Sequence, residues 1–126
     1  MNPNKTVLAF SGYTELSIIV CDLLNDLNMI NNIPFLFIIE KQKLELIKLL
    51  ENLSKGYNRF YKRDKMQSYL SAKDNLSSII SNLYILYKLN IISKDIYFKY
   101  NNLLSAKFSL FNGLLKKIDN RKKEKI

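Results

Sequence analysis

Apolar residues recur at helical spacing along almost the whole chain, and few residues favour turns. Only three Gly and two Pro are present in 126 residues. No segment alternates apolar and polar residues in the manner of a half-buried strand. Because turn-forming residues are scarce, we expect a small number of long helices joined by short connections. The chain is therefore predicted to be all-α.

The N-terminal half contains two such helices. The first apolar stripe, with Thr14 as its expected N-cap, is Leu16, Ile19, Val20, Leu23, Leu27 and Ile30. Residues 31–34, Asn-Asn-Ile-Pro, should end that helix, because the residue before a proline is disfavoured in helical conformation. The second stripe is Phe35, Ile38, Ile39, Gln42, Leu46, Leu49, Leu50 and Leu53. Lys55 and Gly56 are expected to stop it.

The C-terminal half contains two longer helices. The third stripe, entered through Asp64 and ending at Leu89-Asn90, is Met66, Tyr69, Leu70, Lys73, Leu76, Ile80, Leu83 and Tyr87. The fourth, expected to start at Ser93, is Ile96, Tyr100, Leu103, Leu104, Phe108, Phe111, Leu114, Leu115 and Ile118. Four helices with short connections predict an antiparallel, up-down four-helix bundle. We expect an N-terminal arm at residues 1–12, the bundle at 13–118 and a basic tail at 119–126.

The charge of the chain is distributed unevenly. Residues 1–54 contain four Lys and six acidic residues, a net charge of −2, whereas residues 55–126 contain sixteen Lys or Arg and five acidic residues, a net charge of +11. Such asymmetry is typical of a protein with a polyanionic partner, such as nucleic acid. The alternative is a basic face that is merely solvated, in a chain whose codons favour Lys. A codon bias alone does not explain the difference between the two halves.

The residues that carry most enzyme chemistry are missing. The chain has no His and one Cys, Cys21, which we expect to pack on an apolar helix face. Without His, Ser–His and Cys–His pairs and the usual metal-binding patterns cannot form. The carboxylate pairs Asp22/Asp26 and Glu40/Glu45 have the spacing of solvated helix faces. We therefore expect no enzyme activity, no metal and no cofactor.

No segment suggests a membrane or secretory protein. The apolar run at residues 33–39 is much shorter than the ~20 residues of a membrane helix. Residues 1–12 do not resemble a signal peptide. A soluble cytoplasmic protein with no membrane partner is expected.

Basic and aromatic residues alternate where the second and third helices join. Residues 55–63 read Lys-Gly-Tyr-Asn-Arg-Phe-Tyr-Lys-Arg. Cations bind phosphates and exposed rings stack on unpaired bases, so this composition suits RNA or DNA. The alternative is that Tyr57 and Phe60 pack over the end of the bundle. The candidate nucleic-acid-binding residues are Lys55, Arg59, Lys62, Arg63, Lys65, Lys73, Lys116, Lys117 and Arg121.

More apolar residues are present than one bundle core needs. The excess lies at the starts of the second and fourth helices, in Phe35, Leu36, Phe37, Tyr97 and Phe98. An apolar surplus of this kind favours a homo-oligomer interface. The alternative is that the extra rings reflect codon bias.

Five segments carry a resemblance to a known family: EKQKLELIKLL at 40–50, YLSAKDNL at 69–76, LNIIS at 89–93, LLSAK at 103–107 and LFNGLL at 110–115. With the intervening helix lengths, residues 15–118 resemble the accessory variability determinant (Avd-like) proteins of diversity-generating retroelements. Proteins encoded in intervening sequences of ribosomal RNA genes share that bundle. The resemblance rests on apolar spacing and segment lengths.

The resemblance implies a homopentameric barrel that binds RNA or DNA and contacts a reverse transcriptase during mutagenic reverse transcription. Lys62, Arg63 and Lys65 match the basic stretch that opens the family's third helix, and Lys116 and Lys117 match basic residues near the end of its fourth. The chain departs from the family after residue 34, where three apolar residues replace basic ones. A second hypothesis is a helical scaffold of the ribosomal intervening-sequence type, whose basic face binds an acidic protein.

Overall fold

The chain is all-helical over residues 11–124, the part that the computed structural model describes, with side chains described for residues 11–119. This part contains five α-helices, one 3-10 turn and no strand: α1 (Ser11–Asn28), η2 (Ile33–Phe35), α2 (Leu36–Asn58), α3 (Lys62–Lys88), α4 (Lys94–Ser105) and α5 (Phe108–Glu124). The all-α prediction is confirmed. The expected arm at 1–12 lies largely outside the described residues.

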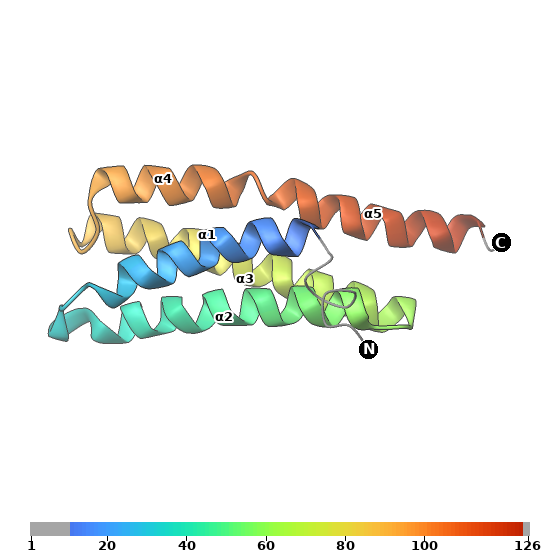
Figure 1. Cartoon of the computed structure of the whole chain (residues 1–126), viewed down its shortest axis with the longest axis horizontal. Helices are drawn as coiled ribbons and strands as arrows, with labels where there is room; N and C mark the ends of the chain where they lie inside the picture. The colour runs from blue at the N-terminus through green and yellow to red at the C-terminus, as the bar shows by residue number, and fades with distance from the viewer. Residues whose placement is uncertain (1–10, 125–126) are drawn as a thin grey trace.

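The helices form an elongated bundle in which sequential helices run in opposite directions, with α4 and α5 together making the fourth rod (Figure 1). The most extensive contact is between α2 and α3. At one end α1 and α4 complete the bundle, and toward the other end α5 packs on α3. The turns at 29–35 and 89–93 lie at one end, and the loop at 59–61, hereafter the tip loop, lies at the other.

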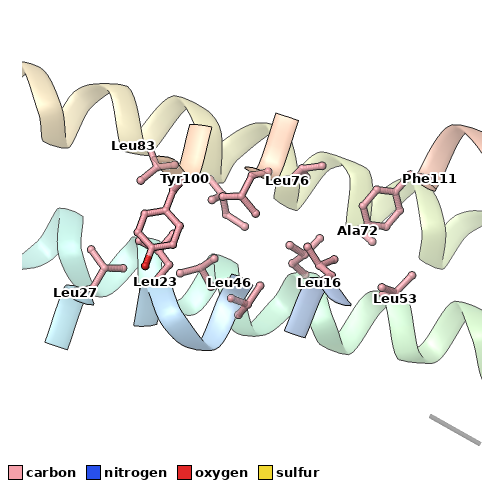
Figure 2. Close-up of a cluster of buried hydrophobic side chains, with 14 of the residues drawn as sticks. Leu16, Leu23, Leu27, Leu46, Leu53, Ala72, Leu76, Leu83, Tyr100 and Phe111 are labelled. Carbon is pink, nitrogen blue, oxygen red and sulfur yellow. The ribbon is translucent and has the colours of Figure 1, made fainter. Parts of the chain in front are cut away.

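The core follows the predicted stripes closely, and Figure 2 shows its central layers. Residues with no exposed surface come from every helix of the bundle: Leu16, Val20, Leu23, Leu27, Ile39, Leu46, Leu49, Leu53, Ala72, Leu76, Ile79, Leu83, Leu86, Tyr100, Leu104 and Phe111. The prediction fails at Leu70 and Leu103, which are 45% and 41% exposed, and it omits Ile79 and Leu86, which are in the core. Cys21 is exposed, so its expected packing role is wrong.

The helix break at residues 31–34, the start at Ser93 and the end near Asn90 were predicted correctly. The Asn32 side chain accepts a hydrogen bond from the Phe35 amide at 3.2 Å, and Pro34 sits in the first turn that follows. Ser93 caps α4 by accepting from the Ile96 amide at 3.2 Å. α3 ends where expected because Asn90 adopts a left-handed conformation (φ 60°). That conformation lets the Ile91 amide donate to the Leu86 carbonyl.

Three expected boundaries are wrong. Thr14 is not a cap, because α1 already includes Ser11. Asp64 lies in the first turn of α3 rather than before it, since the helix begins at Lys62. Gly56 does not stop α2, which continues to Asn58, and no described glycine has a positive φ. Its role is spacing: a Cβ at Gly56 would lie 2.4 Å from the ring of Tyr69, so only glycine lets α2 and α3 approach this closely.

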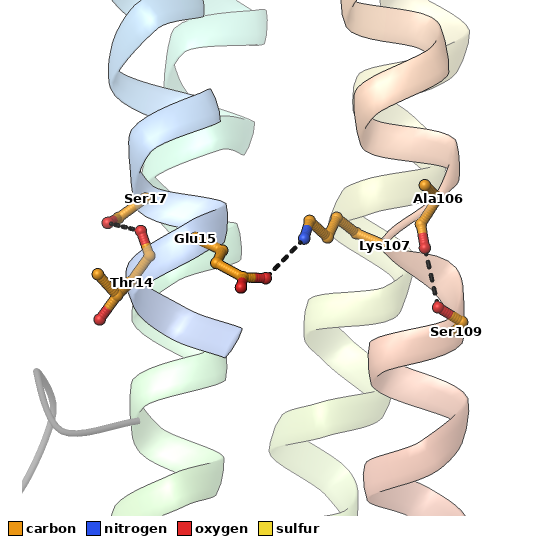
Figure 3. A network of polar contacts seen from close by, with 6 residues as sticks. All are labelled: Thr14, Glu15, Ser17, Ala106, Lys107 and Ser109. Carbon is orange, nitrogen blue, oxygen red and sulfur yellow. Dashed lines mark hydrogen bonds and ion pairs between the residues drawn. The ribbon is translucent and has the colours of Figure 1, made fainter. Parts of the chain in front are cut away.

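The predicted fourth helix is broken at Ala106 and Lys107, between α4 and α5. The Ser109 hydroxyl donates to the Ala106 carbonyl at 2.9 Å, and Lys107 reaches across to the Glu15 carboxylate on α1 at 3.1 Å (Figure 3). The apolar repeat continues through the break, so periodicity alone did not reveal it. At the C-terminus, α5 continues to Glu124, so residue 118 is not a helix end.

Asp26 has a structural partner rather than the solvated role predicted for it. The buried Tyr100 hydroxyl of α4 donates to the Asp26 carboxylate of α1. Burial, and then the adjacent carboxylate, raise the pKa of Tyr100 well above its usual value, because both disfavour the phenolate. This bond fixes α4 against α1.

Gly56 and Gly113 should respond oppositely to alanine. Gly113→Ala should raise the free energy of unfolding by about 1 kcal/mol, because a Cβ there meets no atom within 4 Å and alanine favours helix. Gly56→Ala should lower it by about 1–3 kcal/mol, since the Cβ would overlap the buried Tyr69 ring. Urea denaturation measures both, and a Gly56→Ala protein as stable as wild type would contradict this packing.

Candidate nucleic-acid interface

The tip loop presents two aromatic rings to solvent. It consists of Arg59, Phe60 and Tyr61, between the end of α2 and the start of α3. Phe60 is 89% exposed and Tyr61 is 69% exposed, and their ring centroids are 5.3 Å apart in an edge-to-face arrangement. The alternative that Phe60 packs over the bundle end is therefore wrong. Tyr57, which precedes the loop, is half-buried.

Cations surround these rings. Lys55, Arg59 and Arg63 are exposed, and within the described residues none of the three is paired with a carboxylate. Asp64 is the one acidic residue between positions 55 and 65, where five Lys or Arg give a net charge of +4. We call Lys55, Arg59, Phe60, Tyr61 and Arg63 the tip. It combines free positive charge with accessible ring faces.

Lys65 has a structural role instead of the predicted phosphate contact. Its Nζ donates to the carbonyls of Gly56 and Tyr57 at 2.7 and 3.0 Å. It also lies 5.9 Å from the centroid of the Tyr57 ring and 5.7 Å from that of Tyr69. A cation at the C-terminus of a helix satisfies its last carbonyls and complements its dipole. Lys65 therefore closes α2, and we remove it from the binding surface.

The predicted basic residues of α5 lie beside the start of α3. Lys62 and Arg63 line a hollow together with Met66 and with Ile118 of α5. Lys117 directly precedes Ile118 in the sequence. Both Lys116 and Lys117 are exposed. α5 also packs against α3. The structure thus brings the two predicted basic clusters to the same end of the bundle.

Two other predicted residues do not join the tip. Lys73 is half-buried and lies eleven residues beyond Lys62 on α3, which is about 16 Å along the helix axis. The side chain of Arg121 lies outside the described part of the chain. The signal that sequence reasoning used, the density of Lys and Arg, does not distinguish these positions from the tip.

The predicted oligomer residues fall into two separate groups. Leu36 (46% exposed) and Phe37 (68% exposed) lie on α2, and Phe98 (45% exposed) lies on α4. α2 and α4 are on opposite sides of the bundle (Figure 1). Phe35 and Tyr97 are half-buried, and Tyr97 stacks on Tyr87.

Sequence reasoning missed two residues that extend the α2 group. Leu44 is 51% exposed and Ile47 is 45% exposed. With Phe37 they follow a spacing of seven and three residues, which places them on one helix face. We call Leu36, Phe37, Leu44 and Ile47 the outer stripe of α2. The helical spacing could have revealed it, because α2 has apolar residues on two opposite faces.

Other binding chemistry is scarce in the described part of the chain. The side chains of residues 11–119 include no cluster of three or more Cys, Asp or Glu placed to hold a metal ion. None of the described helices is both long and apolar enough to cross a bilayer. Comparison with family models, curated proteins and solved structures finds no match to the chain. The tip and the outer stripe are the predicted surfaces that the structure leaves open to a partner.

Substitutions at Lys65 and Arg63 should differ in their effect on stability, because the charge of Lys65 is used within the protein and that of Arg63 is exposed. Lys65→Gln should lower the free energy of unfolding by about 1–2 kcal/mol, because two carbonyls at the end of α2 lose a charged donor. Arg63→Gln should change it by less than about 0.5 kcal/mol, as is usual at exposed positions. Urea titrations of the two variants test this, and equal stabilities would contradict the capping role of Lys65.

Proposed function

We propose that the protein is a non-enzymatic nucleic-acid-binding protein whose tip contacts RNA or DNA. The observation that carries the proposal is Phe60, a ring 89% exposed and flanked by cations. Exposed apolar groups beside charged ones mark interaction sites. Arg59 and Arg63 neutralise phosphates, and Phe60 and Tyr61 contact bases or sugars. Binding through these groups is largely independent of sequence.

The biological setting proposed for this activity rests on the Avd-like resemblance. In that setting the protein is an accessory of a diversity-generating retroelement that binds nucleic acid and the reverse transcriptase. The alternative, a scaffold of the ribosomal intervening-sequence type, would use the same cations for an acidic protein. The exposed rings favour nucleic acid, because carboxylates gain nothing from an aromatic face. A neighbouring reverse transcriptase gene with template and variable repeats would support the first setting.

Self-association is part of the proposal. The outer stripe of α2 exposes four large apolar side chains, and burying each in an interface contributes about 1.5–3 kcal/mol. The outer stripe lies within residues 1–54, the half of the chain with a net charge of −2, so contact there limits repulsion between basic subunits. A cyclic oligomer, a pentamer by resemblance, would gather several tips into one multivalent surface.

Charge removal at the tip should weaken binding more than equal removal elsewhere. Arg59→Gln with Arg63→Gln should reduce affinity for duplex DNA at least about 10-fold and lower the slope of log affinity against log salt by about 2. The matched control is Lys41→Gln with Lys48→Gln, which removes the same charge from exposed positions on α2. Both lysines lie beside the outer stripe, so light scattering must first show that this control has the mass of the wild type. Fluorescence anisotropy between 50 and 200 mM salt measures both effects.

Two results of these titrations would contradict the assignment. One is the absence of any binding at 50 mM salt, which would remove the proposed function itself. The other is an equal loss in the tip and control variants, which would show that only net charge matters. Deleting residues 120–126 should reduce affinity less than the tip variant does, so the reverse order would also count against the tip.

Assembly should depend on the outer stripe. Light scattering at micromolar concentration should give a mass well above the 14.8 kDa of one chain. Leu44→Lys with Ile47→Lys should shift it to the monomer, because two charges would then be buried in the interface. Ile18→Lys, at a 60% exposed position on α1, serves as the control. A wild-type mass of one chain would refute self-association.

A further inference from the structure

A second group of exposed rings lies at the end of the bundle opposite the tip. Tyr84 and Tyr87 come from the last two turns of α3, and Tyr97 and Phe98 come from the first turns of α4. We call these four residues the aromatic platform. Neither the tip nor the outer stripe includes any of α3 beyond residue 63 or any of α4. The platform is therefore a surface separate from the tip and from the outer stripe.

The connection between α3 and α4 holds the platform together. Asn90 in its left-handed conformation and the Ser93 cap reverse the chain within five residues. As a result Tyr97 stacks on Tyr87, with ring centroids 4.9 Å apart and planes 13° apart. Tyr84 and Phe98 contact Tyr97 edge-on, at 6.0 and 5.2 Å. Four rings from two helices thus form one continuous surface.

Much of this surface is open to solvent. Tyr84 is 50% exposed and Phe98 is 45% exposed, whereas Tyr87 and Tyr97 are half-buried beneath and beside them. Packing of the bundle therefore needs the inner pair of rings and not the outer pair. Exposed aromatic faces of this size are available to a flat, unsaturated ligand.

Lysines occupy the exposed faces. The Lys88 ammonium lies 5.9 Å from the centroids of both Tyr84 and Tyr87, and that of Lys94 lies 5.9 Å from the centroid of Phe98. Both lysines are exposed, and no carboxylate in the described residues pairs with them. Asp95 is the one acidic residue between positions 84 and 99, which also include Lys99. The platform therefore has a positive rim.

We propose that the aromatic platform stacks unpaired bases of single-stranded nucleic acid while Lys88 and Lys94 bind the adjacent phosphates. This inference rests on the proposed function and adds a second contact surface and a preference for unpaired strands. Flat rings match nucleobases, and the positive rim matches phosphates. A base pair inside a duplex presents only its edges, so a duplex cannot use the ring faces.

Replacement of a lysine by a base on an exposed ring is expected to be favourable, because stacking is the stronger of the two interactions. A lysine over an exposed ring contributes a few-fold to an equilibrium constant. A base stacked on an aromatic side chain contributes about 5- to 150-fold by alanine substitution. When a base replaces the lysine on Tyr84 or Phe98, the displaced ammonium stays within reach of the phosphates. The lysines therefore move from ring to phosphate without losing an electrostatic partner.

The test compares single-stranded and duplex probes. Tyr84→Leu with Phe98→Leu keeps apolar bulk at both positions and removes the ring faces. Anisotropy with an oligoadenylate of about 12 nucleotides should show at least about a 10-fold loss of affinity. A duplex of the same length should lose less than about 2-fold, because it does not use the platform. Thermal melting of the variant, monitored by circular dichroism, verifies that the bundle is intact.

Two further variants keep the result interpretable. Ile85→Ala removes exposed apolar surface from the same turn of α3, at a 40% exposed position, and should leave both affinities unchanged. Tyr84→Phe with Phe98→Tyr retains both rings and should bind as wild type. If this ring-retaining variant binds as poorly as the leucine variant, stacking is not the cause and the inference is wrong.

The remaining outcomes separate this inference from the proposed function. Suppose that both probes bind wild type, and that the leucine variant lowers the affinity for neither probe or for both equally. The platform is then not a stacking surface, while the proposal that the tip binds nucleic acid still stands. If neither probe binds wild type at low salt, the proposed function fails as well. If poly-glutamate competes with oligoadenylate as well as an unlabelled strand does, the surface recognises acidic chains and the inference is overturned.

Discussion

The rest of the structure depends on the contact between α2 and α3. Gln42, fully buried, donates from Nε2 to the Ile79 carbonyl at 2.8 Å. Asn75 of α3 accepts from Asn52 at 2.7 Å and donates to Glu45 at 2.8 Å. A shift of the two helices past each other would break these bonds and leave a buried amide without partners. The contact therefore sets the register of the bundle.

The positions of the tip and of the platform both follow from that register. The approach of α2 and α3 at Gly56 and Tyr69 leaves a loop of only three residues, which turns Phe60 and Tyr61 outward. Lys65 then closes α2 from the α3 side. Nineteen residues further along α3, Tyr84 begins the platform. α3 is thus a rigid spacer that holds the tip and the platform at opposite ends.

Most of the fold could be predicted because it depends on local patterns. Apolar spacing located the helices and nearly all of the core, and the break before Pro34 and the cap at Ser93 followed from side-chain chemistry. The break at Ala106 could not be predicted, since the apolar repeat continues through it. The roles of Gly56 and Asp26 depend on residues of other helices, Tyr69 and Tyr100, which are distant in sequence.

The candidate site was predicted less completely than the fold. Basic density identified Arg59 and Arg63, but it could not separate them from Lys65, whose ammonium is used within the protein. The platform was missed because Tyr87 was assigned to the core, Tyr97 and Phe98 were assigned to an interface, and Tyr84 was assigned to neither. Only the turn at Asn90 brings Tyr84 and Tyr97 together.

The central claim is that nucleic acid contacts the protein through exposed rings at the tip and the platform. Photo-cross-linking of RNA that contains 4-thiouridine, followed by peptide mass spectrometry, tests it directly. The cross-links should fall on Phe60 or Tyr61 and on Tyr84 or Phe98, and should be sparse on α1 and α2. Cross-links concentrated on α1 and on the outer stripe of α2, with none at these rings, would contradict the account.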